Sequence, residues 1–150
     1  MPADLHNAVA SALAGVGQRY TASRRLIVDA LAQAAGPLSI VDVLAAQPAL
    51  PQSSVYRNLT ALEAAGVARR IVVGDYHHYE LSESYTGHHH HLVCAGCGAV
   101  TDVVLRPGAE RAIDRLVEEA VRGTGFRPEG HRLDILGECG RCAGAASGRR

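Results

Sequence analysis

Residues 52–81 read QSSVYRNLTALEAAGVARRIVVGDYHHYEL and carry the signals that decide the fold of the N-terminal half. Val55, Leu59 and Leu62 recur at helical spacing, which predicts an amphipathic helix that ends at Gly66. Two β-prone stretches follow, separated by a Gly-Asp pair that is typical of a tight turn. We therefore expect a helix, residues 52–65, and then a β-hairpin built from residues 67–73 and 76–81.

Three further helices are expected upstream of this stretch. The segment Ala3 to Ala14 is helix-prone, and Thr21 is a suitable N-cap for a helix that continues through Leu31. Ser39 can cap a short third helix with Asp42 at the capping-box position. Short helices followed by a small hairpin have the outline of a winged helix-turn-helix, in which the last helix enters the DNA major groove. We assign residues 1–81 to this domain.

The helix over residues 52–65 carries polar groups away from its apolar stripe, and these are candidate DNA contacts: Ser54, Tyr56, Arg57 and Thr60. Arg57 could bond a guanine or a phosphate, and Tyr56 could pack on a thymine methyl. The alternative is that this is an ordinary solvated helix face. The chain has 15 basic and 15 acidic residues, so any DNA binding depends on local placement rather than on net charge.

The C-terminal half alternates strand and helix signals, which makes the whole chain α+β. Polar residues 82–87 are expected to form a hinge, residues 88–142 a second α/β domain, and residues 143–150 a disordered tail. Within the second domain we predict strands over residues 88–94, 99–105 and 126–137. A helix is predicted over residues 109–122, with Ile113, Leu116, Val117 and Ala120 buried.

Four consecutive histidines open this second domain. Side chains alternate between the faces of a strand, so His88 and His90 point to one face and His89 and His91 to the other. Further ligand groups occur in both halves of the chain: His78, Glu80, Glu110 and His131. Imidazole with carboxylate suits Zn(II), Fe(II), Mn(II) or Ni(II). The alternative is a solvated polar strand edge.

The four cysteines form two Cys-x-x-Cys pairs, and 41 residues (98 to 138) separate Cys97 from Cys139. If Cys94, Cys97, Cys139 and Cys142 meet, they form a closed tetrahedral zinc site with no position left for substrate, which makes the site structural. Unligated thiols or a redox pair are the alternatives.

No export signal and no apolar run of 18 residues occur in the sequence, so we expect a cytoplasmic protein that does not span a membrane. In that reducing compartment, paired cysteines are more often metal ligands than disulfides. An enzyme that uses the histidines, such as a metallohydrolase or a deaminase, is the rival class. The deaminase pattern of His-x-Glu with a later Pro-Cys-x-x-Cys is absent.

Taken together, these motifs resemble the ferric uptake regulator family of metal-responsive transcriptional repressors. The matching segments are GQRYTASRRLIVDAL, SSVYRNLTALEAAGV, YEL, HHHHLVCAGCGAV and HRLDILGECGRC. The resemblance implies a winged-helix domain, a hinge, and a C-terminal dimerisation and metal-binding domain. It also implies a homodimer that binds palindromic operator DNA when metal is bound, and it makes an enzyme the less favoured reading.

The resemblance assigns roles to individual residues. It implies structural zinc at Cys94, Cys97, Cys139 and Cys142, a regulatory site at Glu80, His89 and His91, and a second site at His88, His90, Glu110 and His131. It matches Tyr56 and Arg57 to base contacts and Arg19 to a contact near the minor groove.

The chain departs from the family pattern at two places. Many members supply a regulatory histidine near the second helix, where this chain has Gly36-Pro37-Leu38, and many zinc sensors have a cysteine near the position of Ser82. We hypothesise that His78, on the face of Glu80, is the missing ligand. The ligand set leaves Fe(II) and Zn(II) as the favoured regulatory metals, ahead of nickel, manganese or peroxide sensing.

Overall fold

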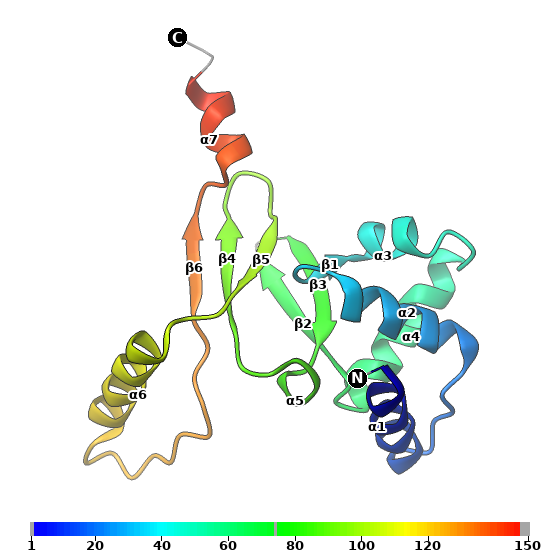
Figure 1. The fold of residues 1–150 in the computed structure, drawn as a ribbon, viewed down its shortest axis with the longest axis horizontal. Coiled ribbons are helices and arrows are strands. Elements are labelled where there is room, and N and C mark those ends of the chain that lie inside the picture. Colours follow the sequence, from blue (N-terminus) through cyan, green and yellow to red (C-terminus); the bar gives the residue numbers. More distant parts are fainter. Residues whose placement is uncertain (1, 74, 148–150) are drawn as a thin grey trace. The chain divides into compact units, whose positions relative to one another are not determined.

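The computed structural model describes residues 2–73 and 75–147. The chain divides into two compact units, Met1–Gly87 and His88–Arg150. Figure 1 shows the helices and strands of each unit. Within the described ranges, no helix combines the length and the apolar character that crossing a membrane requires.

The first unit packs helices against a small sheet, as expected for a winged helix. Its helices are α1 (Pro2–Gly15), α2 (Ala22–Gln33), α3 (Ile40–Ala46), α4 (Gln52–Ala64) and α5 (Glu83–Thr86). Its strands are β1 (Leu38–Ser39), β2 (Ala68–Val73) and β3 (Tyr76–Leu81), in the antiparallel order β1-β3-β2. The predicted caps at Thr21 and Ser39 are present, and Ser39 forms the full capping box with Asp42.

The core of the first unit fixes the orientation of α4. Val55, Leu59 and Leu62 are buried against residues of α1, α2 and the sheet, as the periodicity predicts. The opposite face of α4 is left exposed. Of the predicted hairpin turn, Gly74 lies outside the described residues.

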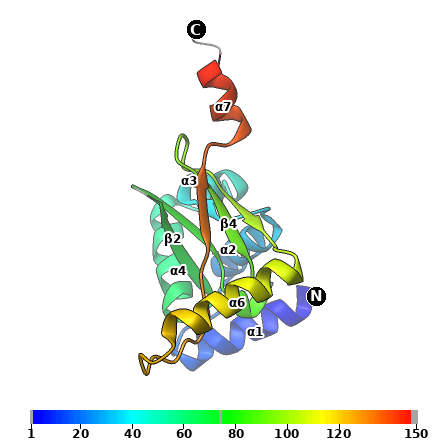
Figure 2. The ribbon, with the colours of Figure 1, turned by 90° about the vertical axis from the view of Figure 1, so that its left-hand side faces the viewer.

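The second unit is a three-stranded sheet with two helices. It contains β4 (His90–Cys94), β5 (Val100–Val103), α6 (Pro107–Val121), β6 (Asp134–Gly137) and α7 (Gly140–Ser147). β4 is the central strand, antiparallel to β5 and parallel to β6. α6 makes the crossover between β5 and β6, and α6 and α7 lie beyond opposite ends of the sheet (Figure 2).

Several local expectations differ from the structure. The strand predicted over residues 126–137 is limited to β6, because Pro128 lacks a backbone N–H and Gly130 is conformationally free. The hinge segment contains the short helix α5, and α7 continues to Ser147, because alanine favours helix where a tail was expected. Residues 148–150 of that tail lie outside the described residues.

The apolar stripe predicted on α6 is present but is not buried within its own unit. Leu116 is 64% exposed, and Ile113 and Val117 are only half-buried. Ala120 is exposed. The sequence correctly marks this face as apolar but cannot say which surface covers it.

Candidate metal centres and DNA-binding surface

The two Cys-x-x-Cys pairs meet at one end of the second sheet. β4 and β6 are parallel, and Cys94 lies opposite Gly137 in the register, so the segments that follow both strands leave at the same edge. The four sulfurs, of Cys94, Cys97, Cys139 and Cys142, all lie within 4.8 Å of one another. We call this group the cysteine cluster. The parallel pairing of β4 and β6 thus brings together two cysteine pairs that are 41 residues apart in the sequence.

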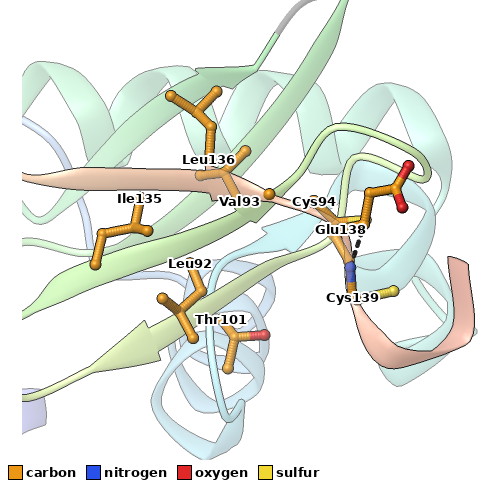
Figure 3. A pocket seen from close by; sticks show the side chains of 10 residues that line it. Leu92, Val93, Cys94, Thr101, Ile135, Leu136, Glu138 and Cys139 are labelled. Atoms are coloured by element: carbon orange, nitrogen blue, oxygen red, sulfur yellow. Dashed lines mark hydrogen bonds between the residues drawn. The ribbon is translucent and has the colours of Figure 1, made fainter. Parts of the chain in front are cut away.

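The backbone around the cysteine cluster favours ionised sulfur. The N–H of Cys139 donates to Cys94 Sγ at 3.2 Å, drawn as a dashed line in Figure 3. This bond, followed by the backbone bonds of Cys97 and Gly96, lowers the pKa of Cys94 to about 6. Hydrogen bonds with the neighbouring sulfurs, that of Cys139 first, raise the pKa of Cys142, because they stabilise its protonated form. A cation of charge two or more is needed to keep all four ionised.

A glycine makes room for this cluster. A Cβ added to Gly96 would lie 3.1 Å from Cys142 Sγ and 3.2 Å from Cys142 Cβ, so a larger residue would push the second cysteine pair away. Gly98 has φ +72°, a conformation that glycine adopts without strain.

A second group gathers around Glu110, near the start of α6, and we call it the Glu110 cluster. Glu110 Oε1 lies 3.0 Å from both His88 Nε2 and His131 Nε2, and Oε2 lies 3.0 Å from His90 Nε2. The hydrogen bond with His90 lowers the pKa of Glu110. Three imidazole nitrogens that converge on one carboxylate form a nitrogen-rich ligand set suited to Zn(II), Fe(II) or Mn(II).

The other two histidines of the run form a separate group with Asp102 of β5, the Asp102 cluster. Asp102 lies opposite His91 in the register of β4 and β5. Its Oδ1 is 3.8 Å from His91 Nε2 and 4.0 Å from His89 Nε2, and the two rings stand at 90° with centroids 5.2 Å apart. Ligand atoms of these three residues all lie within 4.8 Å of one another.

Asp134 orients one member of the Asp102 cluster from the opposite side. Its Oδ1 lies 3.0 Å from His91 Nδ1, and Arg132 Nη2 lies 2.7 Å from its Oδ2. Burial opposes ionisation of Asp134, but the bonds from Arg132 and His91 outweigh it and lower the pKa of this carboxyl. A carboxylate on the far nitrogen of a histidine fixes the ring and its tautomer for a metal on the near nitrogen.

Sequence reasoning missed Asp102 and Asp134. The available signal for Asp102 was an acidic residue inside the apolar stretch AVTDVVL, residues 99–105. None of the three clusters in the described residues contains His78. His78 is buried, its Nδ1 has no hydrogen-bond partner among those residues, and burial lowers its pKa.

Glu80 lies in β3 of the first unit, directly opposite Arg69 of β2. Its side chain is 7% exposed, and Arg69 Nε donates to Glu80 Oε1. Glu80 is thus a buried carboxylate at the end of the wing, two residues before the segment expected to be a hinge.

The exposed face of α4 carries the candidate DNA contacts. Tyr56 is 50% exposed, and Arg57 Nε donates to the carbonyl of Ser53 at 3.3 Å. Thr60 donates to the Tyr56 carbonyl, and Ser54 Oγ accepts from Asn58. Thr60 is exposed and Ser54 is partly covered.

Arg19, the remaining candidate contact, is exposed in the loop before α2. Arg24 connects that loop to α4, since its Nη2 donates to Gln18 Oε1 at 2.8 Å, its Nη1 to the Arg19 carbonyl, and its Nε to Asn58 Oδ1 at 3.2 Å. The loop and α4 are therefore held to one another.

Comparison with known proteins gives a consistent result. A family model described as "Ferric uptake regulator family" matches residues 15–136. The ferric uptake regulation protein of Campylobacter jejuni is 30% identical over 133 residues, 84% of this chain and 80% of that protein. The peroxide operon regulator of Bacillus subtilis is 28% identical over 131 residues, 85% and 86% of the two chains. The crystal structure of the Vibrio cholerae ferric uptake regulator, 26% identical, has a TM-score of 0.70 and covers 86% of this chain and 98% of its own.

Proposed function

Because the chain belongs to the ferric uptake regulator family, we propose that it represses genes by binding palindromic operator DNA as a homodimer when its regulatory site holds a divalent metal. It is a metal-responsive transcriptional regulator rather than an enzyme, and its partners are DNA and a second copy of itself. We place its action in the cytoplasm and its targets among iron or zinc uptake genes.

The observation that carries the proposal is the division of one histidine run between two ligand sets. His89 and His91 join Asp102, whereas His88 and His90 join Glu110 and His131. A solvated polar edge would not bury His90 and His91 to 1% exposure and place a carboxylate oxygen 3.0 Å from each. We assign the cysteine cluster to structural zinc and the Glu110 cluster to a second metal.

For the regulatory site we propose His89, His91 and Asp102, with Glu80 of the wing as the further ligand that the family resemblance implies. We propose Asp102, in place of His78, as the ligand that the family pattern leaves missing, because Asp102 Oδ1 lies within 4.0 Å of both His89 and His91. A divalent metal would be coordinated by carboxylates and imidazoles that belong to both domains. Joining them would restrict the hinge and favour one separation of the two α4 helices of the dimer.

The surface of the second unit suggests where the second copy binds. Leu92, Ile135 and Leu136 are exposed and border a recess of about 250 Å³ beside the cysteine cluster (Figure 3). Leu92 and Ile135 lie opposite one another in the β4–β6 register and so share one face of the sheet, and Leu116 is exposed on α6. Exposed apolar side chains of this kind are typical of a surface that a homodimer covers.

The sensed metal is a finer proposal. The Asp102 cluster contains nitrogen and oxygen ligands and no thiolate, a ligand set that suits Fe(II). Zn(II) binds such ligands more tightly than Fe(II) in the usual affinity order. We propose Fe(II) or Zn(II).

The test is operator binding under anaerobic conditions, titrated with buffered Fe(II), Mn(II), Ni(II) and Zn(II), together with the metal content of the isolated protein. We expect tight binding to a palindromic operator with one metal and weak binding after chelation. Absence of sequence-specific DNA binding with every metal would refute the proposal.

A further inference from the structure

Arg69 connects two carboxylates of the first unit. It lies opposite Glu80 in the β2–β3 register, and its Nε donates to Glu80 Oε1. Its Nη1 donates to Glu83 Oε1, at the start of α5, at 2.7 Å. Side-chain exposures are 30% for Arg69, 33% for Glu83 and 7% for Glu80. The guanidinium thus bonds one buried and one half-exposed carboxylate.

The pairing solves a physical problem that Glu80 creates. A carboxylate with so little solvent contact is strongly destabilising unless a cation or several donors compensate its charge. Arg69 supplies that compensation from the neighbouring strand. Burial disfavours the charged guanidinium, but its bonds to Glu80 and then Glu83 outweigh this and raise the pKa of Arg69, so the cation persists at every physiological pH.

We propose that Arg69 is a built-in competitor of the regulatory metal for Glu80. In the metal-free protein the guanidinium neutralises this carboxylate, and a divalent cation must displace it before Glu80 can serve as a ligand. Arg69 therefore sets the metal concentration at which the site fills. This inference rests on the proposed function, which makes Glu80 a regulatory ligand.

Glu83 makes the displacement reversible. When a metal takes Glu80, Arg69 keeps its bond to Glu83 and does not become an unpaired half-buried cation. When the metal leaves, the guanidinium remains close enough to Glu80 to return. The competitor therefore lowers metal affinity without a large structural change in the wing.

The chain offers a matched control in the adjacent arginine. Arg70 points to the opposite face of the same strand, because side chains alternate, and its Nε lies 3.4 Å from Glu63 Oε1 of α4. Replacing Arg70 by glutamine removes the same charge from β2 but leaves the Arg69–Glu80 bond in place. Comparison of the two variants therefore distinguishes the effect of the Arg69–Glu80 contact from the effect of removing one positive charge from the strand.

The experiment measures Co(II) affinity by absorbance in protein whose cysteine cluster is loaded with zinc. The substitution Glu110→Gln is present in every variant, because it weakens metal binding at the Glu110 cluster. In that background we compare Arg69→Gln, Arg70→Gln and Glu80→Gln. Loss of one charge-assisted hydrogen bond from the metal-free state predicts about tenfold tighter Co(II) binding in Arg69→Gln. Arg70→Gln, a surface pair, is expected to stay within about twofold.

A second measurement, thermal unfolding with and without Co(II), reports on the metal-free state directly. Arg69→Gln should lower the thermal unfolding midpoint of the metal-free protein, since Glu80 loses its partner, and should enlarge the increase that Co(II) produces. If Arg69→Gln does not fold, Arg69→Lys is used, for which a smaller affinity gain is expected, because Lys keeps the charge but has a single ammonium in place of the forked guanidinium.

The outcomes distinguish the inference from the proposal beneath it. Unchanged Co(II) affinity in Glu80→Gln would show that Glu80 is not a ligand of the regulatory site, and it would therefore also refute the inference about Arg69. Weaker binding in Glu80→Gln, combined with no gain in Arg69→Gln, would refute the competitor and leave the ligand assignment intact. An equal gain of Co(II) affinity in Arg70→Gln would show that the loss of any positive charge from β2 has this effect. That result would also refute Arg69 as a direct competitor.

Discussion

Replacing Asp134 by asparagine should weaken metal binding at the Asp102 cluster without removing a ligand. Asp134 accepts from two groups, His91 Nδ1 at 3.0 Å and Arg132 Nη2 at 2.7 Å. An asparagine has one acceptor oxygen, so its NH2 group must face one of these donors. One charge-assisted hydrogen bond is lost, worth about 1.5 kcal/mol, which corresponds to about tenfold weaker metal binding.

The assay is a Co(II) or Mn(II) titration of zinc-loaded protein, followed by operator binding at fixed free metal. Asp114→Asn is the matched control, because Asp114 lies 3.7 Å from His131 Nδ1 and its side chain is 57% exposed. We expect the control to change affinity by less than about twofold. Equal affinities for Asp134→Asn and the unaltered protein would show that His91 does not depend on Asp134 for its orientation.

Four further outcomes follow from the same geometry. Cys97→Ser should abolish zinc retention and unfold the second unit, as metal analysis and circular dichroism would show, because a structural zinc site contributes directly to folding. Arg57→Ala should weaken operator binding about ten- to a hundredfold and reduce the preference over scrambled DNA; an equal loss on both DNAs would indicate a phosphate contact instead. Arg24→Gln and Asn58→Ala should each weaken DNA binding about tenfold, with a double variant no worse than either if Arg24 acts by holding the loop to α4. Because the pKa of Glu110 is lowered in the fold, its ionised form stabilises the protein above the unfolded pKa of about 4.3. This contribution disappears as pH falls through the lowered value, so Glu110→Gln should cost stability in denaturant at pH 6, and the cost should shrink steadily as the solution is made more acidic than the unfolded pKa.

The N-terminal unit was largely predictable because its signals are local. The stripe of Val55, Leu59 and Leu62 fixes the buried face of α4, and the caps at Thr21 and Ser39 fix where α2 and α3 begin. Each signal acts within a few residues of the element that it specifies. The family resemblance was likewise carried by contiguous motifs.

The composition of the Asp102 cluster could not be predicted in the same way. Asp102 follows His91 by eleven residues in the chain, and only the antiparallel register of β4 and β5 places the two opposite one another. A shift of one residue would turn Asp102 to the other face of the sheet. The sequence located both strands but did not fix their register. For the same reason the parallel neighbour β6, which brings Asp134 to His91, was not foreseen.

The architecture of the second unit connects the cysteine cluster to the Asp102 cluster, our proposed regulatory site. β4 carries His91 three residues before Cys94, and β6 carries Asp134 five residues before Cys139. Joining the cysteine pairs therefore fixes the ends of two parallel strands, which have no tight turn of their own to set their register. That register places Asp134 opposite His91 and so sets the orientation of the His91 imidazole. Removing zinc from the cysteine cluster should therefore lower affinity at the Asp102 cluster even under conditions in which the protein remains folded. In the zinc-free protein, Asp134→Asn should then have little additional effect, because the contact that it weakens is already lost.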